Sequence, residues 1–356
     1  MSGLKRRGFL GLAGAFPALA LGAGARRHWQ WKMVTSWPKN SPGPGRSAER
    51  LARRLESASG GRLQVKVFGA GELVPALEVF DAVSRGTAEL GHTAALFWAG
   101  KLPASPFFTA VPFGLTPGEH AAWIYHGGGQ QLWERLYAPF GIQPYMAGNT
   151  GMGMGGWFKQ EIRTLEDLQG LKVRIPGLGG QVYRRLGALP VVLAPGEIYT
   201  ALHAGVVDGA EFVGPWSDLA LGLHRAAPYY YWPGFHEPNG TGECLVNREA
   251  LATLPDDLQT LLMDACAAEH AQALAESQWF HGEALNTLVS EHGVQLRAFP
   301  EPVLAAAREA SEAVLVELAA ENSLAGEIHA SFQAARGRLM DWSRVSLRAF
   351  LDARPA

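Results

Sequence analysis

Apolar and polar positions alternate in several short runs near the start of this chain, and segments with helical spacing separate these runs. Residues 29–37, 63–68 and 90–93 show the alternation of half-buried strands, whereas 46–57 and 74–85 carry apolar residues at helical spacing. A regular order of strand and helix is typical of sheets whose strands run largely parallel. The pattern therefore predicts an α/β lobe in the N-terminal part of the chain.

The alternation continues to about residue 213 and then gives way to long helices. The further predicted elements are helices over 112–137, 165–169, 180–186 and 195–205, and strands over 142–146, 171–175, 191–193 and 210–213. Ala, Leu, Glu and Gln dominate the C-terminal third, which predicts long helices over 258–281 and 302–318 and a further one over 327–351. The sequence thus predicts α/β architecture followed by a helical C-terminus.

The first 25 residues are expected to act in export rather than in the fold. Arg6 and Arg7 precede an apolar run over residues 11–22, and the small residues 23–25 supply a cleavage site. This pattern is typical of a twin-arginine signal. The alternative is a membrane anchor, but the apolar run is too short and too rich in Gly and Ala to span a bilayer comfortably. The mature protein is therefore expected in the periplasm.

Composition narrows the classes of protein to which the chain can belong. It has 356 residues, 47% of them hydrophobic, which is enough for two lobes with separate cores. Without residues 1–25 it carries 28 basic and 33 acidic residues, a formal net charge of −5. No basic block remains that could follow a phosphate backbone, so nucleic acid is not an expected partner. Cys244 and Cys266 could bridge in an oxidising compartment, but two separate buried thiols are the favoured interpretation.

Two charged residues interrupt apolar runs and suggest a binding site. Arg174 ends a short β-branched run just before the turn Pro176–Gly177, and such a strand tip can hold a guanidinium where it forks onto a carboxylate. Glu211 lies in an otherwise apolar predicted strand. A cation and an anion on neighbouring strand ends favour a pocket for a small acid and a metal. The alternatives are a surface arginine and a glutamate that caps a helix or joins two lobes.

Several short motifs lack the context that their usual functions require. Gly151–Gly156 satisfies G-x-G-x-x-G, but no helix opens at its third glycine and no acidic residue follows at the required spacing, so a dinucleotide site is not expected. The pair His236-Glu237 lacks the second histidine of a metalloprotease helix. Asn239-Gly240-Thr241 fits a glycosylation sequon, although Asn-Gly is commonly a turn. His92 is expected to be a satisfied core residue.

Longer runs distributed over the mature chain are more specific than these motifs. They are Trp31–Pro38, Pro75–Val83, Gly148–Gly151, Met154–Phe158, Arg174–Gly180, Glu211–Pro215 and Tyr230–Pro238. With these runs the chain resembles the solute receptors of tripartite ATP-independent periplasmic (TRAP) transporters. Within that family it is similar to the branch that binds 2-oxo and 2-hydroxy monocarboxylates, such as pyruvate, other α-keto acids or lactate, beside a sodium or calcium ion.

The resemblance implies a fold and a partner as well as a ligand. The expected fold is a two-lobe α/β periplasmic binding protein, type II-like, with crossing strands and long C-terminal helices. Lobe I would comprise 26–151 and about 240–280, and lobe II 152–239 and about 281–325. The remaining residues, about 326–356, would form a terminal helix that exchanges between the subunits of a homodimer. The receptor would deliver its acid to the permease subunits in the membrane.

The resemblance also assigns residues to the ligand. Arg174 stands at the position of the carboxylate-binding arginine, and Asn149 could donate to an oxygen of the acid. Phe97 and Trp98 are candidates for an aromatic wall. Gly153 stands where the branch commonly has a glutamine that reaches the ligand or the metal. The missing amide either leaves room for a larger acid or gives one coordination position to water.

Three positions match the metal site of the resembling branch. Glu211 stands at the metal-binding carboxylate, where it would also face the substrate, and Glu243 stands at a second acidic position near the metal. Phe212 replaces the usual tryptophan, but the ligand there is the backbone carbonyl, so the exchange should preserve it.

Two other classes of function stay open on the sequence alone. A metal-dependent enzyme acting on 2-oxo acids would need an acid or base placed to move a proton, and no dedicated pair is evident. A sensor or adhesion module would be expected to carry a retained anchor or an appended domain, and neither is recognised. The sequence therefore favours a receptor over an enzyme.

Overall fold

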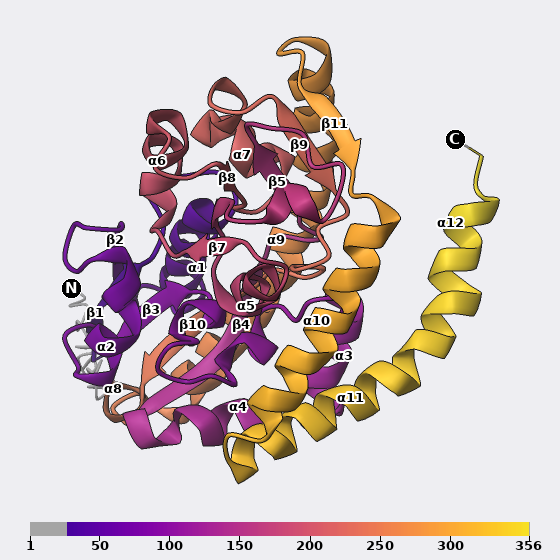
Figure 1. The fold of residues 1–356 in the computed structure, drawn as a ribbon. Helices are drawn as coiled ribbons and strands as arrows, with labels where there is room; N and C mark the ends of the chain where they lie inside the picture. Colours follow the sequence, from indigo (N-terminus) through magenta and orange to yellow (C-terminus); the bar gives the residue numbers. More distant parts are fainter. Residues whose placement is uncertain (1–26, 356) are drawn as a thin grey trace, which may run out of the picture.

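The computed structural model describes residues 27–355 and contains two β-sheets surrounded by helices (Figure 1). The first sheet has five strands in the spatial order β2 (Leu63–Phe68), β1 (Trp29–Thr35), β3 (Leu90–Thr93), β10 (Thr241–Asn247) and β4 (Ile142–Asn149). β1 pairs in parallel with β2 and β3, whereas β10 runs antiparallel to β3 and β4. The predicted strands 63–68 and 90–93 are confirmed with their bounds.

The second sheet is built from shorter strands. Its order is β11 (Gln295–Ala298), β9 (Tyr229–Trp232), β5 (Gly156–Phe158), β8 (Gly209–Ala210), β6 (Lys172–Arg174) and β7 (Leu189–Val191). β6 pairs in parallel with β7 and β8, and β5 lies antiparallel to β8 and β9. The sequence pattern does not predict β9 and β11.

Helices connect the strands and form the C-terminal third. They are α1 (Pro44–Ala58), α2 (Val79–Ser84), α3 (Pro117–His126), α4 (Gly129–Tyr137), α5 (Gly177–Arg185), α6 (Ile198–Ala204), α7 (Pro215–Leu221), α8 (Arg248–Ala252), α9 (Asp256–Ser290), α10 (Glu301–Ala319), α11 (Ser323–Ser343) and α12 (Ala349–Ala353). The single helical region predicted over 112–137 is wrong, because Gly127 and Gly128 separate α3 from α4 and Gly128 adopts a φ of 84°. The helix predicted over 258–281 is confirmed but extends to Ser290.

The strand predicted over 210–213 is also wrong, and this matters for the site. β8 ends at Ala210, so Glu211 follows the strand instead of lying within it. The backbone N–H of Glu211 still donates to the Arg174 carbonyl at 3.0 Å. The N–H groups of Val213 and Gly214 then turn to the Asp218 carboxylate, at 3.3 and 3.2 Å, instead of to a neighbouring strand. Asp218 thereby fixes the segment that carries Glu211.

Three connections among the described residues join the sheets: β4 to β5, β9 to β10, and the one from β10 to β11 that contains α9 (Figure 1). α9 has 35 residues, packs along β4, and contacts both α1 and α7. One apolar core lies where α1 and α9 cover the first sheet, and a second lies under α6 and the C-terminal part of α9 at the second sheet. The confirmed fold class is therefore a two-sheet α/β protein with long C-terminal helices.

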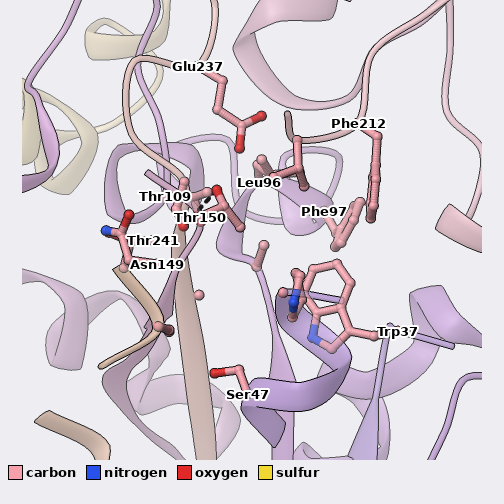
Figure 2. Close-up of a pocket in the computed structure, with 18 of the residues that line it drawn as sticks. Trp37, Ser47, Leu96, Phe97, Thr109, Asn149, Thr150, Phe212, Glu237 and Thr241 are labelled. Carbon is pink, nitrogen blue, oxygen red and sulfur yellow. Dashed lines mark hydrogen bonds between the residues drawn. The ribbon is translucent and has the colours of Figure 1, made fainter. Parts of the chain in front are cut away.

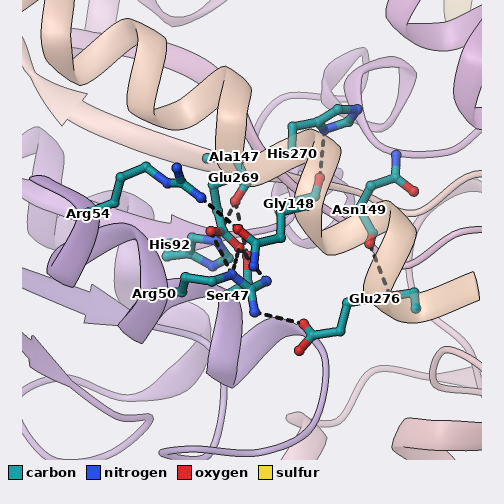
Figure 3. Close-up of polar contacts among 12 residues, drawn as sticks. Ser47, Arg50, Arg54, His92, Ala147, Gly148, Asn149, Glu269, His270 and Glu276 are labelled. Carbon is teal, nitrogen blue, oxygen red and sulfur yellow. Dashed lines mark hydrogen bonds and ion pairs between the residues drawn. The ribbon is translucent and has the colours of Figure 1, made fainter. Parts of the chain in front are cut away.

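Side chains of α9 hold the end of β4 in place (Figure 3). His270 Nδ1 donates to the Gly148 carbonyl at 2.8 Å, and Ser277 Oγ donates to the Asn149 carbonyl at 3.2 Å. Further along the helix, His281 Nε2 lies 3.0 Å from the Thr150 carbonyl. Three successive carbonyls of the crossover are thus satisfied by one helix face, which a buried backbone segment outside regular pairing requires.

A cluster of buried and partly buried charged side chains lies next to these contacts between α9 and β4 (Figure 3). Glu269 on α9 accepts from the Arg50 guanidinium through Nε and Nη2, at 2.9 and 2.7 Å, and from Ser47 Oγ at 2.7 Å. Glu276 accepts from Arg50 Nη1 at 2.9 Å. This group fixes α1 against α9 and therefore fixes the position of Ser47 beside the pocket described below.

The two cysteines are buried and free, as expected. Cys244 lies on β10 and Cys266 on α9, within the same apolar core. Among the described helices, none is both long and apolar enough to cross a membrane. The predicted export signal, residues 1–25, lies outside the described residues.

Candidate functional site

A pocket lies between the two sheets and takes residues from both (Figure 2). The empty space, open mouth included, is about 560 Å³. Aromatic and aliphatic side chains form one wall, hydroxyl and amide groups form the opposite wall, and charged groups gather at one end. The lining residues used below are Trp37, Ser47, His92, Leu96, Phe97, Thr109, Asn149, Thr150, Arg174, Glu211, Phe212, Glu237 and Thr241.

Arg174 provides the positive charge at this end. It is the last residue of β6, and only 1% of it is exposed. Nη1 donates at 2.6 Å to both the carbonyl and the Oε1 atom of Glu211, while Nε and Nη2 donate to the Leu193 carbonyl at 3.3 and 3.2 Å. Burial lowers the pKa of Arg174, and the carboxylate of Glu211 is the main group that opposes this shift. One Nη2 hydrogen is left without an acceptor among residues 27–355.

Glu211 is held from two sides. Its Oε1 atom accepts from Arg174, and its Oε2 atom accepts from His236 Nε2 at 3.2 Å. Only 3% of Glu211 and 4% of His236 are exposed. Neighbouring strand ends therefore bring Arg174 and Glu211 together, as the sequence pattern suggested, in a closely paired arrangement away from bulk water.

Glu237 brings a second carboxylate to the same place. Its side chain points into the pocket from the turn after β9 (Figure 2), and it accepts no hydrogen bond from the described residues. Removal from water raises the pKa of Glu237 well above its ordinary value, and the nearby Glu211 charge adds to this rise. Ligand atoms of Glu211, His236 and Glu237 all lie within 4.8 Å of one another.

The charges at this end of the pocket do not cancel. With both glutamates ionised, Glu211 and Glu237 carry two negative charges against the single positive charge of Arg174. A buried excess of one negative charge is costly unless a cation or a proton neutralises it. Carboxylate oxygens are the donors that hard cations such as calcium and sodium prefer, so the donor set fits such an ion.

The apolar wall is rigid. Trp37 packs against Phe97 with ring centroids 5.9 Å apart, and Phe212 joins them from the opposite sheet (Figure 2). Trp37 Nε1 donates to His92 Nδ1 at 2.9 Å, so the His92 proton lies on Nε2, which donates to the Ala147 carbonyl at 2.7 Å. Burial lowers the pKa of His92 to about 4. His92 is thus a satisfied buried residue, as expected, although it also supports the pocket wall.

The polar wall is mostly engaged in hydrogen bonds of its own. Asn149 Nδ2 donates to Asn239 Oδ1 at 2.8 Å and to Thr241 Oγ1 at 3.3 Å, while its Oδ1 atom accepts from the Gly151 N–H at 2.8 Å. Asn149 therefore lines the pocket as expected, but both of its N–H groups are already in use. Binding to a ligand oxygen would require it to give up one of these bonds.

The structure does not bring Glu243 or Trp98 to the pocket. Glu243 is fully buried in the core around the first sheet, where its carboxyl accepts from Trp98 Nε1 at 2.7 Å and from the Tyr137 hydroxyl at 3.1 Å. Burial raises the pKa of Glu243 to about 8. The side chain of Glu243 therefore does not reach the pocket, whereas the nearby Glu237 lines it.

Gly153 also lies outside the pocket lining. Its N–H donates to the Glu237 carbonyl at 3.1 Å, and a Cβ atom added to it would stand 3.0 Å from that oxygen and 3.1 Å from the Val213 carbonyl. The missing side chain therefore lets the crossover pass closely between two segments. It does not open visible space for a larger acid.

Sequence reasoning missed three functional positions, namely Trp37, His236 and Glu237. The pair His236-Glu237 was tested only against a helical metalloprotease motif, whereas it lies in a turn between two crossing segments. The available signal was its position at the end of the run Tyr230–Pro238, which carries the family resemblance. A Pro-bounded turn with adjacent histidine and glutamate after a strand is a better match to a cation site than to a catalytic helix.

Comparisons with known proteins agree with this geometry. The family profile of bacterial extracellular solute-binding proteins, family 7 (DctP), matches residues 33–322. The chain is 43% identical over 317 residues to the monocarboxylate 2-oxoacid-binding periplasmic protein of Nostoc sp., and the match covers 89% of this chain and 86% of that protein.

Three solved structures of TRAP solute-binding proteins are similar with a TM-score of 0.90 each. The protein of Colwellia psychrerythraea, with bound calcium and pyruvate, is 40% identical, and that of Pseudoalteromonas atlantica, with bound sodium and pyruvate, is 38% identical; each match covers 92% of this chain and 100% of the other. The protein of Bordetella bronchiseptica, a dimer with calcium and picolinate in the occupied site, is 36% identical, and the match covers 92% of this chain and 97% of that one.

These relatives confirm the predicted receptor class and exclude the enzyme alternative at the level of the family, since the matched proteins bind solutes. The chain belongs to the DctP family of bacterial extracellular solute-binding proteins, the solute receptors of TRAP transporters.

Proposed function

We propose that this protein binds a small 2-oxo or 2-hydroxy monocarboxylate together with a metal ion, and that it delivers the acid to the permease of a TRAP transporter. The observation that carries the proposal is the grouping of Arg174, Glu211 and Glu237 at one end of a pocket with an aromatic wall. A guanidinium and a cation suit a carboxylate, and the aromatic wall suits a short carbon chain. The pyruvate in two of the similar structures supports this ligand class.

The residues present fit a hard cation. Glu211 and Glu237 would hold it through carboxylate oxygens, and the backbone carbonyl of Phe212 is the third donor that we propose. Such an ion supplies positive charge for the carboxylate and for the neighbouring oxo or hydroxyl oxygen of the acid. Two ionised glutamates, one arginine and one monocarboxylate carry a net charge of −2. A divalent ion neutralises this net charge, whereas a monovalent ion leaves a net charge of −1. The charge sum therefore favours calcium over sodium in this protein.

Arg174 would bind the carboxylate of the acid. Its one free Nη2 hydrogen can donate directly, and a two-point fork becomes possible if Glu211 releases Nη1. The bond from His236 to the other oxygen of Glu211 would keep that carboxylate oriented during the exchange. Arg174 would then pair with the acid and keep its bond to the backbone carbonyl of Glu211, while the cation would balance the Glu211 carboxylate.

The described fold supports a further proposal about the two halves of the protein. Residues 26–151 with about 240–280 would form lobe I around the first sheet, and 152–239 with about 281–325 would form lobe II around the second. Closure of the lobes over the acid, with movement about the crossing segments, would present a new surface to the permease. Export through the twin-arginine route is part of the same proposal, because a receptor of this kind works outside the cytoplasmic membrane.

A homodimer formed through the C-terminal arm, residues about 326–356, is also proposed. Figure 1 shows α11 and α12 as a curved arm whose end projects from the body. Six large apolar residues on this arm are between 45% and 67% exposed: Met340, Trp342, Val345, Leu347, Phe350 and Leu351. Such an exposed apolar stretch is typical of an interaction surface. The dimer of the similar Bordetella structure supports the proposal.

The ligand assignment is tested by thermal unfolding and calorimetry of metal-stripped protein. Pyruvate, lactate and branched 2-oxo acids are added with calcium, with sodium, or with neither. A true ligand at about 100 times its Kd stabilises the folded state by about 2.7 kcal/mol and raises the Tm. We expect pyruvate with calcium to give a larger shift than either alone, and NMR to recover the acid unchanged. The proposal fails if no 2-oxo or 2-hydroxy acid shifts the Tm with either ion.

A further inference from the structure

The Thr109 hydroxyl is a polar group in the pocket wall that the contacts described so far do not explain. Thr109 follows the short 3-10 helix Ser105–Phe108, and only 1% of it is exposed. Its side chain lines the pocket beside Thr150 and Thr241, on the wall opposite Phe212 (Figure 2). Within residues 27–355, no protein atom forms a hydrogen bond with its Oγ1 atom.

Hydrogen bonds fix the backbone of Thr109, so the unpaired hydroxyl does not belong to a flexible segment. Its N–H donates to the Pro106 carbonyl at 3.0 Å, and its own carbonyl accepts from Asn239 Nδ2 at 2.6 Å and from the Thr241 N–H at 3.5 Å. Only the rotation of the side chain about its Cα–Cβ bond remains. The hydroxyl is therefore held at the pocket by the surrounding polar network without being a member of it.

The other hydroxyl and amide groups of the same wall do have partners. Thr241 Oγ1 accepts from Asn239 Nδ2 at 2.9 Å and lies 3.1 Å from His120 Nδ1, and Thr150 Oγ1 donates to the Gly240 carbonyl at 3.4 Å. Asn149 uses both of its N–H groups, as described above. The Thr109 hydroxyl is the exception among these groups. Its burial costs free energy, because a buried donor without an acceptor loses its hydrogen bonds to water and gains none in return.

We propose that Thr109 is a ligand-binding residue whose hydroxyl donates to an oxygen of the bound acid on the side facing the first sheet. This inference rests on the proposed function and adds a contact from the polar wall. Arg174 and the cation site hold the acid at the charged end of the pocket, and a donor on the polar wall fixes its orientation. Valine has nearly the same shape as threonine. Thr109→Val would therefore remove the donor from the pocket and would also remove the unpaired hydroxyl from the free protein.

The two effects of that change have opposite signs, which makes the test specific. In metal-stripped protein without acid, Thr109→Val should raise the Tm by about 1–3 °C, because a buried unpaired hydroxyl is removed. Its affinity for pyruvate in saturating calcium should fall by about 10- to 100-fold, the loss of one hydrogen bond to a charged acceptor. A purely structural role would instead lower the Tm and leave affinity unchanged.

Calorimetry with pyruvate and calcium chloride, beside thermal unfolding, decides the matter. Thr109→Ser keeps the donor and should bind pyruvate within about threefold of the unaltered protein, whereas Thr109→Ala should lose affinity as the valine variant does. Thr253→Val, at the exposed end of α8, is the matched control; its hydroxyl bonds only to the Ala250 carbonyl of the same helix, at 2.7 Å, so its loss should leave the pyruvate affinity unchanged and should not raise the Tm. Equal pyruvate affinity in the unaltered protein and Thr109→Val overturns the inference alone. Failure of the unaltered protein to bind any 2-oxo acid overturns the proposed function, and this inference with it.

Discussion

Replacing Glu237 by glutamine tests the metal site most directly, because it removes one charge and keeps the size of the side chain. In the structure, Arg174 and Glu211 already form a close pair, and Glu237 adds the unbalanced negative charge beside them once a cation displaces its proton. Glu237→Gln leaves a neutral pair, which gives a cation little net attraction. We therefore expect calcium binding to weaken strongly while the fold persists.

The size of the effect follows from electrostatics. A pair of unit charges about 4 Å apart at an effective dielectric constant of about 20 interacts by roughly 4 kcal/mol, so a divalent ion gains roughly 8 kcal/mol from one carboxylate. Removing the carboxylate and the ion from water costs several kcal/mol, which offsets part of this attraction. The glutamine carbonyl still offers an oxygen. The expected net loss is therefore about 3–4 kcal/mol, or roughly 200- to 1000-fold in Kd.

The assay is calorimetric titration of metal-stripped protein with calcium chloride, and Glu243→Gln is the matched control. Glu243 is a buried glutamate in the same segment of chain, but its carboxyl is bound by Trp98 and Tyr137 away from the pocket. The control should bind calcium within about twofold of the unaltered protein. Calcium affinity within threefold for Glu237→Gln, or a large loss for Glu243→Gln, would refute the reasoning and restore the assignment made from the sequence.

Three further predictions follow from the same structure. Arg174→Ala should abolish detectable pyruvate binding in calorimetry while circular dichroism stays unchanged, and an unaltered Kd would contradict the role of Arg174. The contribution of Glu243 to the free energy of unfolding should fall as the pH rises from about 5 to 8, because burial raises the folded pKa of Glu243 to about 8 and the folded state keeps a proton that the unfolded chain has already lost. The slope from this group is at most about 1.4 kcal/mol per pH unit, so in denaturant titrations the unaltered protein should lose stability relative to Glu243→Gln over this range; parallel curves would refute the assignment. Deletion of the chain from residue 344 should leave a monomer in light scattering at micromolar concentration, and a persisting dimer would exclude the arm as the interface.

Arg174 and Glu211 were predictable because each breaks an apolar run next to a signal for the end of a strand. β6 and β8 are neighbours in the sheet, and the Glu211 N–H donates to the Arg174 carbonyl, so the two side chains emerge side by side. The strand–helix order of the first lobe was predictable for a similar reason, because alternating runs and runs with helical spacing follow one another along that part of the chain. Features of the fold that depend on a short stretch of residues can therefore be predicted from the sequence.

Glu237 and Glu243 show where local pattern fails. They lie six positions apart, on either side of the turn that enters β10, and nothing in the sequence states which of them faces the pocket. β10 pairs with β4 through a register shift between Thr241 and Glu243. Since a shift of one residue reverses the face on which side chains lie, this irregularity directs Glu243 into the core beside Trp98. The choice depends on a tertiary pairing that the sequence pattern does not reveal.

The pocket also shows how binding energy can control closure. Each wall is held rigidly by its own bonds: Arg174 to the Leu193 carbonyl on one side, and Trp37 to His92 on the other. Beside the pocket, α7 meets α1 and the residues just before it through a hydrogen bond of 3.2 Å from Ser217 Oγ to the Pro42 carbonyl and through the Arg46 guanidinium, 5.4 Å from the Trp216 ring. Contacts of these kinds contribute about 1–3 kcal/mol together, whereas a ligand bound at micromolar Kd contributes about 8 kcal/mol. The charge pairing of acid and cation at Arg174, Glu211 and Glu237 would therefore outweigh these two contacts in favouring a closed form.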